Sequence, residues 1–154
     1  MSVSSQNLIL PFLGPLYRAL SPLAELLLRV AIGGFLIPHG LQKAFGAFGG
    51  PGFGGTAGFL AGLGMTPGWL WATVAIIVEI GCGALILIGF LTRPAAAIAF
   101  VFLLVATVSV HLQNGFFASS GGYEFALMWA IGALFFAVRG AGPISVDRML
   151  GREF

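Results

Sequence analysis

The chain has 154 residues, of which 58% are hydrophobic and 8% are charged, with a mean hydropathy of +1.03 and a formal net charge of +2. This composition is too apolar for a soluble globular domain, so it indicates an integral membrane protein built as one compact unit. The single cysteine, Cys82, excludes an internal disulfide, a CxxC redox pair and a multi-cysteine metal site. Neither a P-loop nor a dense basic stretch occurs, which argues against phosphate chemistry and nucleic-acid binding.

Residues 1–21 are predicted to form an N-terminal arm or interfacial segment, with the helical membrane domain covering residues 22–154. The arm lacks the positively charged start of a cleavable signal peptide, and Pro11, Gly14 and Pro15 interrupt its apolar run.

Apolar stretches long enough to cross a bilayer, which takes roughly 20 residues, predict an all-α polytopic four-helix bundle. Pro38 lies inside the first of them and removes a helical hydrogen bond, so the sequence predicts a kink or local unwinding just before His39. The predicted spans are approximately residues 22–44, 68–90, 94–112 and 123–139.

The segment between the first two spans, "GAFGGPGFGGTAGFLAGLGMTPG", is rich in glycine but retains several phenylalanines. This mixture predicts a loop that folds back over the mouth of the bundle, with "TAGFLAGL" as a short interfacial helix.

The basic residues predict the orientation of the bundle. With four spans, one side carries most of the arginines, whereas the opposite side carries only Lys43. By the positive-inside rule both termini are predicted to be cytoplasmic, and the glycine-rich loop faces outward. The arginines on the predicted cytoplasmic side are Arg18, Arg93, Arg139, Arg148 and Arg152, with Arg29 near the start of the first span.

Titratable residues inside the spans fall at two predicted depths. At 1.5 Å per residue, His39 and His111 lie roughly 25 Å from the cytoplasmic face, with Glu124 slightly further out. Glu79 lies roughly 16 Å deep and Arg29 roughly 10 Å deep, so these two side chains are predicted to pair if their helices touch.

Helical phase places Arg29, Lys43 and His39 on one stripe of the first span, and Glu79 on a face of small residues that turns toward the bundle. Thr107, His111 and Asn114 follow i, i+4, i+7 spacing and form a polar edge on the third span.

Each of these residues also has a structural interpretation. Arg29 and Glu25 can form an i, i+4 ion pair, the histidines can be interfacial, and Lys43 can extend to the headgroups. Glu79 is the strongest functional candidate, because a carboxylate at mid-membrane is costly unless it is paired or neutral.

Several motifs in this order resemble the DoxX family of small bacterial four-helix membrane proteins, over roughly residues 22–147. They are Arg29, "HGLQK", the glycine-rich loop, Glu79 in "VEIGCGALILIGFLTR", His111 in "VSVHLQNGF", Glu124 in "GGYEFAL" and the closing "GAGPISVD".

The resemblance implies a multi-pass protein of the bacterial inner membrane and a link to redox metabolism, since the family takes its name from subunits of quinone-linked oxidase and thiosulfate:quinone oxidoreductase complexes. It implies that an enzymatic role, if the protein has one, is that of a quinone-linked oxidoreductase subunit. The polar residues carried over from it are Arg29, His39, Lys43, Glu79, His111 and Glu124.

A quinone site needs hydrogen-bond donors for two ring carbonyls, an apolar slot, and groups that exchange protons, which histidine and glutamate can supply. The hypothesis assigns catalytic roles to Glu79, His111 and His39, and cofactor contacts to Arg29, Lys43, Glu124 and Asn114. Lys43 and His39 can alternatively attract an anionic sulfur substrate. The chain has no motif for haem, flavin or iron–sulfur attachment, so electrons would come from the substrate or from a partner protein.

Other functions remain open on the sequence. The chain can be a non-enzymatic membrane anchor or assembly partner of a redox or stress-related complex, or an oligomeric pathway for protons or small molecules. A metal site formed by His39, His111 and Glu124 is a minor variant.

Overall fold

The computed structural model describes residues 8–152, and these residues form helices and connecting loops without β-strands. The predicted arm falls partly outside them, since residues 1–7 are not described. The main helices are α1 (Gly14–Phe45), α2 (Gly52–Gly62), α3 (Gly68–Ile76), α4 (Gly83–Ile88), α5 (Thr92–Ala106), α6 (Glu124–Arg139) and α7 (Val146–Met149). Short 3-10 turns lie at Pro11–Leu13, Ala47–Gly49, Leu112–Asn114 and Ala118–Ser120.

Three helical stretches are long and apolar enough to cross a membrane: Pro11–Phe45, Gly68–Ile88 and Thr92–Asn114. The fourth predicted span corresponds to α6, which has 16 residues and is therefore about 24 Å long. This is shorter than the roughly 30 Å hydrocarbon core of a typical bilayer. The all-helical membrane class is confirmed, whereas a fourth complete crossing is not.

The first span differs from its prediction at two places. Helix α1 begins at Gly14 rather than near Pro22, and it continues through Pro22 and Pro38 without the unwinding expected before His39. Each proline removes one backbone hydrogen bond, but the remaining helical bonds on either side hold the segment together.

Two π-helical segments interrupt the other long helices. The segment η4 (Ile77–Cys82) joins α3 to α4, and η5 (Thr107–His111) follows α5. A π-turn inserts an extra residue, shifts the helical phase, and is often found at functional sites. Here the two segments contain Glu79 and His111, which the sequence had singled out as site residues.

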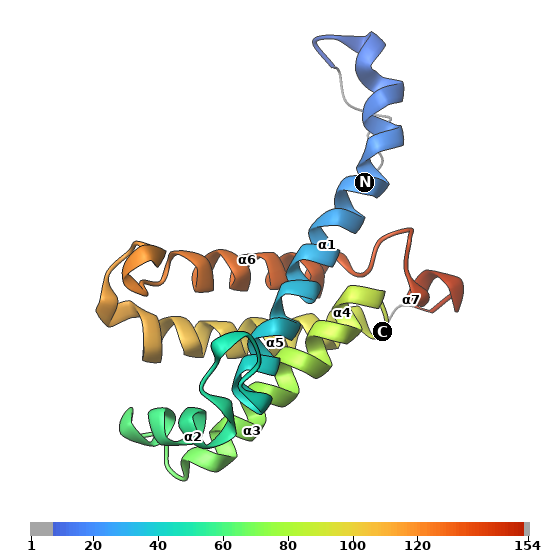
Figure 1. The fold of residues 1–154 in the computed structure, drawn as a ribbon. Coiled ribbons are helices and arrows are strands. Elements are labelled where there is room, and N and C mark those ends of the chain that lie inside the picture. Colours follow the sequence, from blue (N-terminus) through green and yellow to red (C-terminus); the bar gives the residue numbers. More distant parts are fainter. Residues whose placement is uncertain (1–7, 153–154) are drawn as a thin grey trace.

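The helices pack through small side chains. Helix α1 crosses α4 and η4, while α5 and α6 form an antiparallel hairpin beside them (Figure 1). Gly33 of α1 lies directly against the backbone of α4, a close approach that only a residue without a Cβ permits. The buried core is correspondingly rich in alanine: Ile32, Leu36, Val78, Cys82, Ile86, Ala95, Ala96, Ala99, Leu103, Ala130, Ala133 and Phe136.

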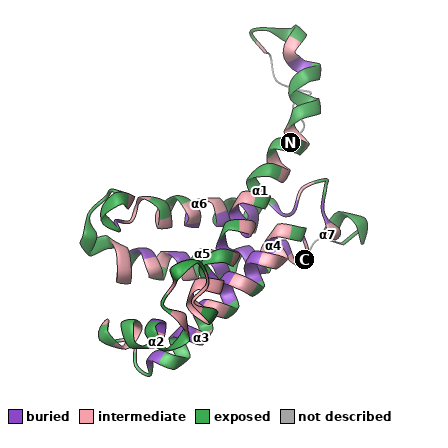
Figure 2. Cartoon of the chain, viewed as in Figure 1, coloured by how far each residue is buried: buried purple, intermediate pink, exposed green. Residues whose placement is uncertain are grey.

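The glycine-rich loop contains the predicted short helix, which is α2, and it packs on α3 and on the end of α1. At the opposite end of the molecule, the first turns of α1 extend beyond the other helices (Figures 1 and 2). Large apolar side chains near the start of α1, among them Leu16 and Leu20, are exposed.

Candidate functional site

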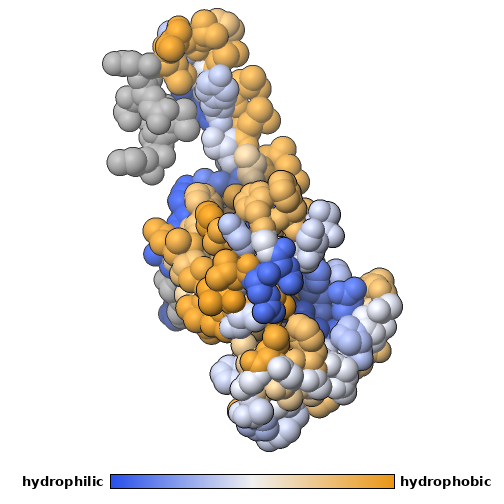
Figure 3. Space-filling model, turned by 90° about the vertical axis from the view of Figure 1, so that its left-hand side faces the viewer, coloured by the Kyte–Doolittle hydropathy of each residue, from blue (hydrophilic) through white to orange (hydrophobic). Residues whose placement is uncertain are grey.

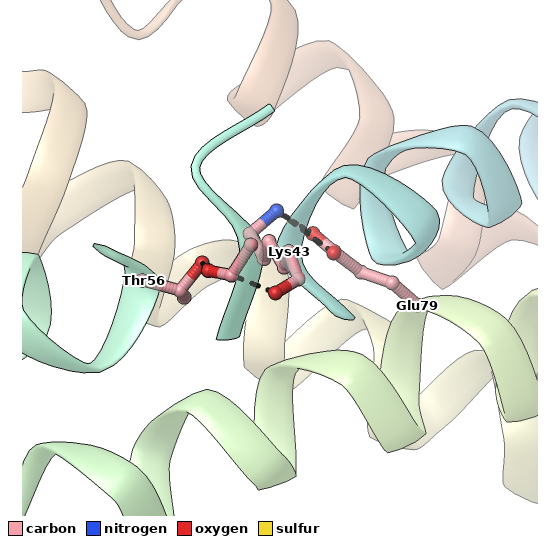
Figure 4. A network of polar contacts seen from close by, with 4 residues as sticks. Lys43, Thr56 and Glu79 are labelled. Atoms are coloured by element: carbon pink, nitrogen blue, oxygen red, sulfur yellow. Dashed lines mark hydrogen bonds and ion pairs between the residues drawn. The ribbon is translucent and has the colours of Figure 1, made fainter. Parts of the chain in front are cut away.

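Lys43 and Glu79 form an ion pair between α1 and η4 in which the ammonium contacts both carboxylate oxygens. The Lys43 Nζ donates to Glu79 Oε1 at 2.7 Å and to Oε2 at 2.8 Å. Figure 4 shows the lysine side chain directed at this carboxylate. The Glu79 side chain is 7% exposed and that of Lys43 is 28% exposed. The pair therefore neutralises a carboxylate that would otherwise be very costly in an apolar setting.

Gly40 allows this pair to form. A Cβ at position 40 would lie 2.5 Å from Ile80 Cγ1 and 3.1 Å from Glu79 Cβ, so α1 and η4 approach more closely there than any other residue would allow. Lys43 follows one turn later on α1, on the side that faces η4.

Thr56 connects α2 to the same region. This residue is buried, and its hydroxyl donates to the Gly52 carbonyl at 2.8 Å and makes a long contact of 3.5 Å with the Lys43 carbonyl. Figure 4 shows Thr56 beside the lysine backbone. Helix α2 is thereby held next to the ion pair.

His39 lies one turn before Lys43 on α1, next to the hairpin of α5 and α6. Its ring meets the ring of Trp129 edge-to-face, with 6.1 Å between the centroids. The Trp129 indole nitrogen donates to the Ile32 carbonyl at 3.0 Å. Because this hydrogen bond orients the indole ring, Trp129 gives His39 an apolar wall on one side.

His111, in η5, is held by the loop that follows it. Its Nδ1 lies 2.8 Å from the Gly121 carbonyl oxygen, which can only accept a hydrogen bond. Nδ1 therefore carries the proton in this contact, and Nε2 is left as the nitrogen that can accept a proton or meet a ligand.

A groove of about 910 Å³ joins these residues. Its titratable lining side chains are His39, Lys43, Glu79 and His111, with Thr56 as a further polar group, and the rest of its lining is overwhelmingly apolar. A groove of this size and character is typical of a site for a small amphipathic molecule. We call it the polar-apolar groove.

Asn114 and Glu124 do not line the polar-apolar groove, although the sequence placed both beside His111. The Asn114 amide makes long contacts with the Val110 and Gly121 carbonyls, at 3.4 and 3.3 Å. Glu124 Oε2 accepts from the Ala118 amide at 2.9 Å, so it closes the loop before α6. Both side chains are used within the loop that connects the hairpin.

The metal variant finds no support in the geometry. Within residues 8–152 no group of three His, Cys, Asp or Glu side chains is placed to hold a metal ion, so His39, His111 and Glu124 do not form one ligand set.

Arg29 lies in a different cluster, and its predicted pairing with Glu79 is wrong because Lys43 occupies that carboxylate. The buried guanidinium donates instead to the Ala141 carbonyl and to the Ile144 carbonyl, and its distance to the Ile144 oxygen is 2.7 Å. The alternative Arg29–Glu25 ion pair does not form either, since Glu25 accepts from Arg139 at 2.9 Å. Arg29 thus fastens the segment after α6 to α1.

Asp147 of α7 completes this second cluster. Its carboxylate accepts from the amides of Leu91 at 2.9 Å and Thr92 at 3.1 Å, and its own amide donates to the Gly89 carbonyl at 2.8 Å. The side chain is 2% exposed and caps the start of α5 from a distant part of the chain.

Replacing Asp147 with alanine is expected to lower the free energy of unfolding by about 2 kcal/mol, because two buried amides at the start of α5 lose their acceptor. Thermal unfolding in detergent, followed by circular dichroism, measures the effect. An Asp147→Asn variant retains one acceptor oxygen and is expected to lose less. Equal stability of wild type and Asp147→Ala would contradict this capping role.

Among the residues that shape the polar part of the groove, sequence reasoning missed Thr56 and Trp129. Thr56 has a detectable signal, since it is a rare polar residue in a segment of glycine and apolar side chains. Trp129 has none, because an aromatic residue in a membrane helix is more often a packing or interfacial residue.

Comparison with known proteins places this chain in a family. The DoxX family model matches residues 24–112, a range that contains Arg29, His39, Lys43, Glu79 and His111 but not Asn114 or Glu124. No solved structure gives a significant match.

Similar proteins are known from enteric bacteria. Inner membrane protein YphA of Escherichia coli (strain K12) is 30% identical over 137 residues, which cover 86% of this chain and 94% of that protein. Inner membrane protein YqjF of the same strain is 32% identical over 103 residues, covering 67% of this chain and 78% of that protein. Together with the three helices able to cross a bilayer, these matches show that the chain is a multi-pass inner-membrane protein that belongs to the DoxX family.

Proposed function

We propose that this protein is a quinone-linked subunit of a membrane redox complex and that the polar-apolar groove binds the quinone. One observation carries the proposal: an otherwise apolar groove of about 910 Å³ gathers His39, Lys43, Glu79 and His111 from separate parts of the chain. A quinone has the matching chemistry, since its ring carbonyls accept hydrogen bonds and its ring and tail are apolar.

The donors in the groove fit the two carbonyls of a quinone ring. An ammonium group has three N–H donors, and Lys43 directs two of its contacts to Glu79, which leaves a donor for a ligand. The imidazole of His39 supplies a further donor. His111 donates from Nε2 when its ring carries both protons, because its Nδ1 proton is already used by the Gly121 carbonyl. When bound, the quinone supplies the two-electron, two-proton redox chemistry.

The protein groups would hold the ring and handle protons. His111 is oriented by the Gly121 carbonyl, so its Nε2 can deliver or receive a proton at a fixed position. Glu79, held by Lys43, can store a proton within the span. The electrons would come from a partner protein.

The charge balance of the groove favours a neutral ligand over an anionic sulfur compound. Glu79 already cancels the charge of Lys43 at 2.7 Å, so the groove offers no excess positive charge to attract thiosulfate. In this proposal both termini are cytoplasmic and the groove lies toward the periplasmic half of the membrane, as the distribution of arginines predicts.

Protein purified in mild detergent is expected to retain quinone, and Glu79→Gln and His111→Ala are expected to retain at least about tenfold less. Glu79→Gln removes the negative charge that positions the Lys43 ammonium, and His111→Ala removes the imidazole itself. Mass spectrometry of organic extracts measures the quinone per chain. Glu25→Gln is the matched control, since it makes the same chemical change in the pair with Arg139, outside the groove. A folded wild type without quinone, even after incubation with added quinone, would refute the proposal.

An anchoring role is the second candidate, and it is favoured by the extension of α1 beyond the bundle with exposed apolar side chains such as Leu16 and Leu20 (Figure 1). The same preparations distinguish the two functions. An anchor would co-purify with a protein, contain no quinone, and keep its partner in the Glu79→Gln variant.

A further inference from the structure

The polar-apolar groove has two unlike halves. Its polar lining side chains come from the end of α1, from α2, and from the π segments η4 and η5. The lining side chains contributed by α3 and α5 are all apolar. A molecule that fills the whole groove would therefore place a polar head against the first half and an apolar portion against the second.

The apolar half lies where α3 and α5 diverge. Helix α5 packs mainly against α6 and also against η4 and α4, while α3 packs mainly against α2 and η4. The wedge between α3 and α5 is consequently not filled by direct helix packing, and the groove occupies it.

The rim of this wedge consists of apolar side chains that line the groove and are also exposed. On α5, Ile98 is 53% exposed and Val101 is 59% exposed, and on α3, Trp71 is 41% exposed. These residues lie within the stretches that can cross a membrane, so their exposed surfaces face lipid. Figure 3 shows apolar surface along the extension of α1 and beside a hydrophilic patch in the middle of the face, above a lower part of intermediate hydropathy.

We propose that the wedge between α3 and α5 is a side opening to the bilayer, and that the isoprenoid tail of the quinone enters through it and lies along Val74, Ile98 and Val101. This inference rests on the proposed function and adds the route by which the quinone enters and the place where its tail binds. The head then reaches His39, Lys43, Glu79 and His111 without leaving the membrane.

Tail length by itself is expected to change the affinity of the wild type little. An isoprenoid tail that moves from lipid into the wedge exchanges one apolar environment for another, so the hydrophobic effect contributes almost nothing. Space is the discriminating factor, because a bulky side chain placed in the wedge excludes the tail but leaves room for the head.

The test compares a long-tailed ubiquinone with the tailless dimethoxy-methyl-benzoquinone head, each titrated into purified protein in nanodiscs. Ile98→Trp is expected to weaken binding of the long-tailed molecule at least about tenfold and to leave binding of the head unchanged. Val101→Trp is a second variant with the same expectation. Ile77→Trp is the matched control, since Ile77 is 62% exposed and does not line the groove.

The outcomes separate this inference from the proposed function. If the wild type binds neither molecule, the proposed function fails. If the wild type binds both and the folded Ile98→Trp and Val101→Trp variants still bind both equally well, the side opening is wrong while the quinone site stands. The side opening is also wrong if these variants weaken binding of the head as much as binding of the long-tailed molecule. It is wrong as well if Ile77→Trp weakens binding of the long-tailed molecule as much as they do.

Discussion

Replacing Gly33 with alanine is expected to force α1 away from α4 and to lower the free energy of unfolding by about 3 kcal/mol or more. A Cβ at this position would lie 2.5 Å from the Leu87 backbone nitrogen and 2.6 Å from the Gly83 carbonyl oxygen. Both are backbone atoms of the facing helix, so no change of rotamer relieves the clash. The helices themselves must separate, and the core around Leu36 and Ile86 opens.

Gly34 provides the matched control on the next residue of the same helix. A Cβ there would lie 3.6 Å from Leu87 Cδ1, an ordinary contact, so Gly34→Ala is expected to fold like the wild type. Thermal unfolding and size-exclusion elution in detergent measure both variants side by side. If Gly33→Ala were as stable as Gly34→Ala, α1 and α4 would not pack in the way described.

Replacing Lys43 alone with methionine is expected to cost about 2–4 kcal/mol of unfolding free energy, because it leaves the Glu79 carboxylate buried without its partner. The effect lies toward the lower part of the range for buried pairs, since Lys43 is 28% exposed and water reaches it in part. The Lys43→Met/Glu79→Met double variant is expected to recover most of the loss, because an apolar pair of similar volume has no charge to desolvate.

A double-mutant cycle checks this expectation with Lys43→Met, Glu79→Met and the double variant, each followed by thermal unfolding in detergent. Strictly additive effects would mean that the two side chains do not interact as the structure places them. Quinone retention gives a second readout on the same proteins. A stable double variant that has lost quinone would separate the role of the pair in the site from its role in folding.

The side opening depends on a different property of the fold from these two predictions. Gly33 and the ion pair hold α1 to the helix made of α3, η4 and α4, whereas the wedge exists because α5 leaves that helix beyond η4. The molecule therefore combines a close contact of α1 with η4 and α4 with a wedge between α3 and α5 that helix packing leaves open.

The π segments explain why sequence periodicity was only partly informative about the site. Helical phase computed at 3.6 residues per turn is valid as long as the helix is regular. The extra residues in η4 and η5 shift that phase at Glu79 and His111 themselves. A helical wheel drawn for a regular α-helix therefore does not predict which side chains share a surface beyond these segments. Asn114 illustrates this, since it follows His111 at helical spacing yet does not line the groove.

The sequence alone determined the class of the protein. Apolar stretches of sufficient length must be helical in a bilayer, because a backbone without water has to satisfy its own hydrogen bonds. The burial of Glu79 among small residues was also predictable, since a carboxylate at mid-span cannot face lipid. The presence of a short helix in the glycine-rich loop was predicted as well and is confirmed.

Only the tertiary structure decided which polar residues meet. Depth along each helix predicted that Arg29 could pair with Glu79. The close approach of the helices at Gly40 instead brings Lys43 to the Glu79 carboxylate. Arg29 donates to backbone carbonyls of the segment after α6. Glu124 likewise accepts a hydrogen bond from the Ala118 amide in the loop rather than from the histidines. The physical reason is that depth and phase are properties of one helix, whereas an ion pair or a groove depends on which helices touch. Small residues far apart in the sequence set the distance between those helices.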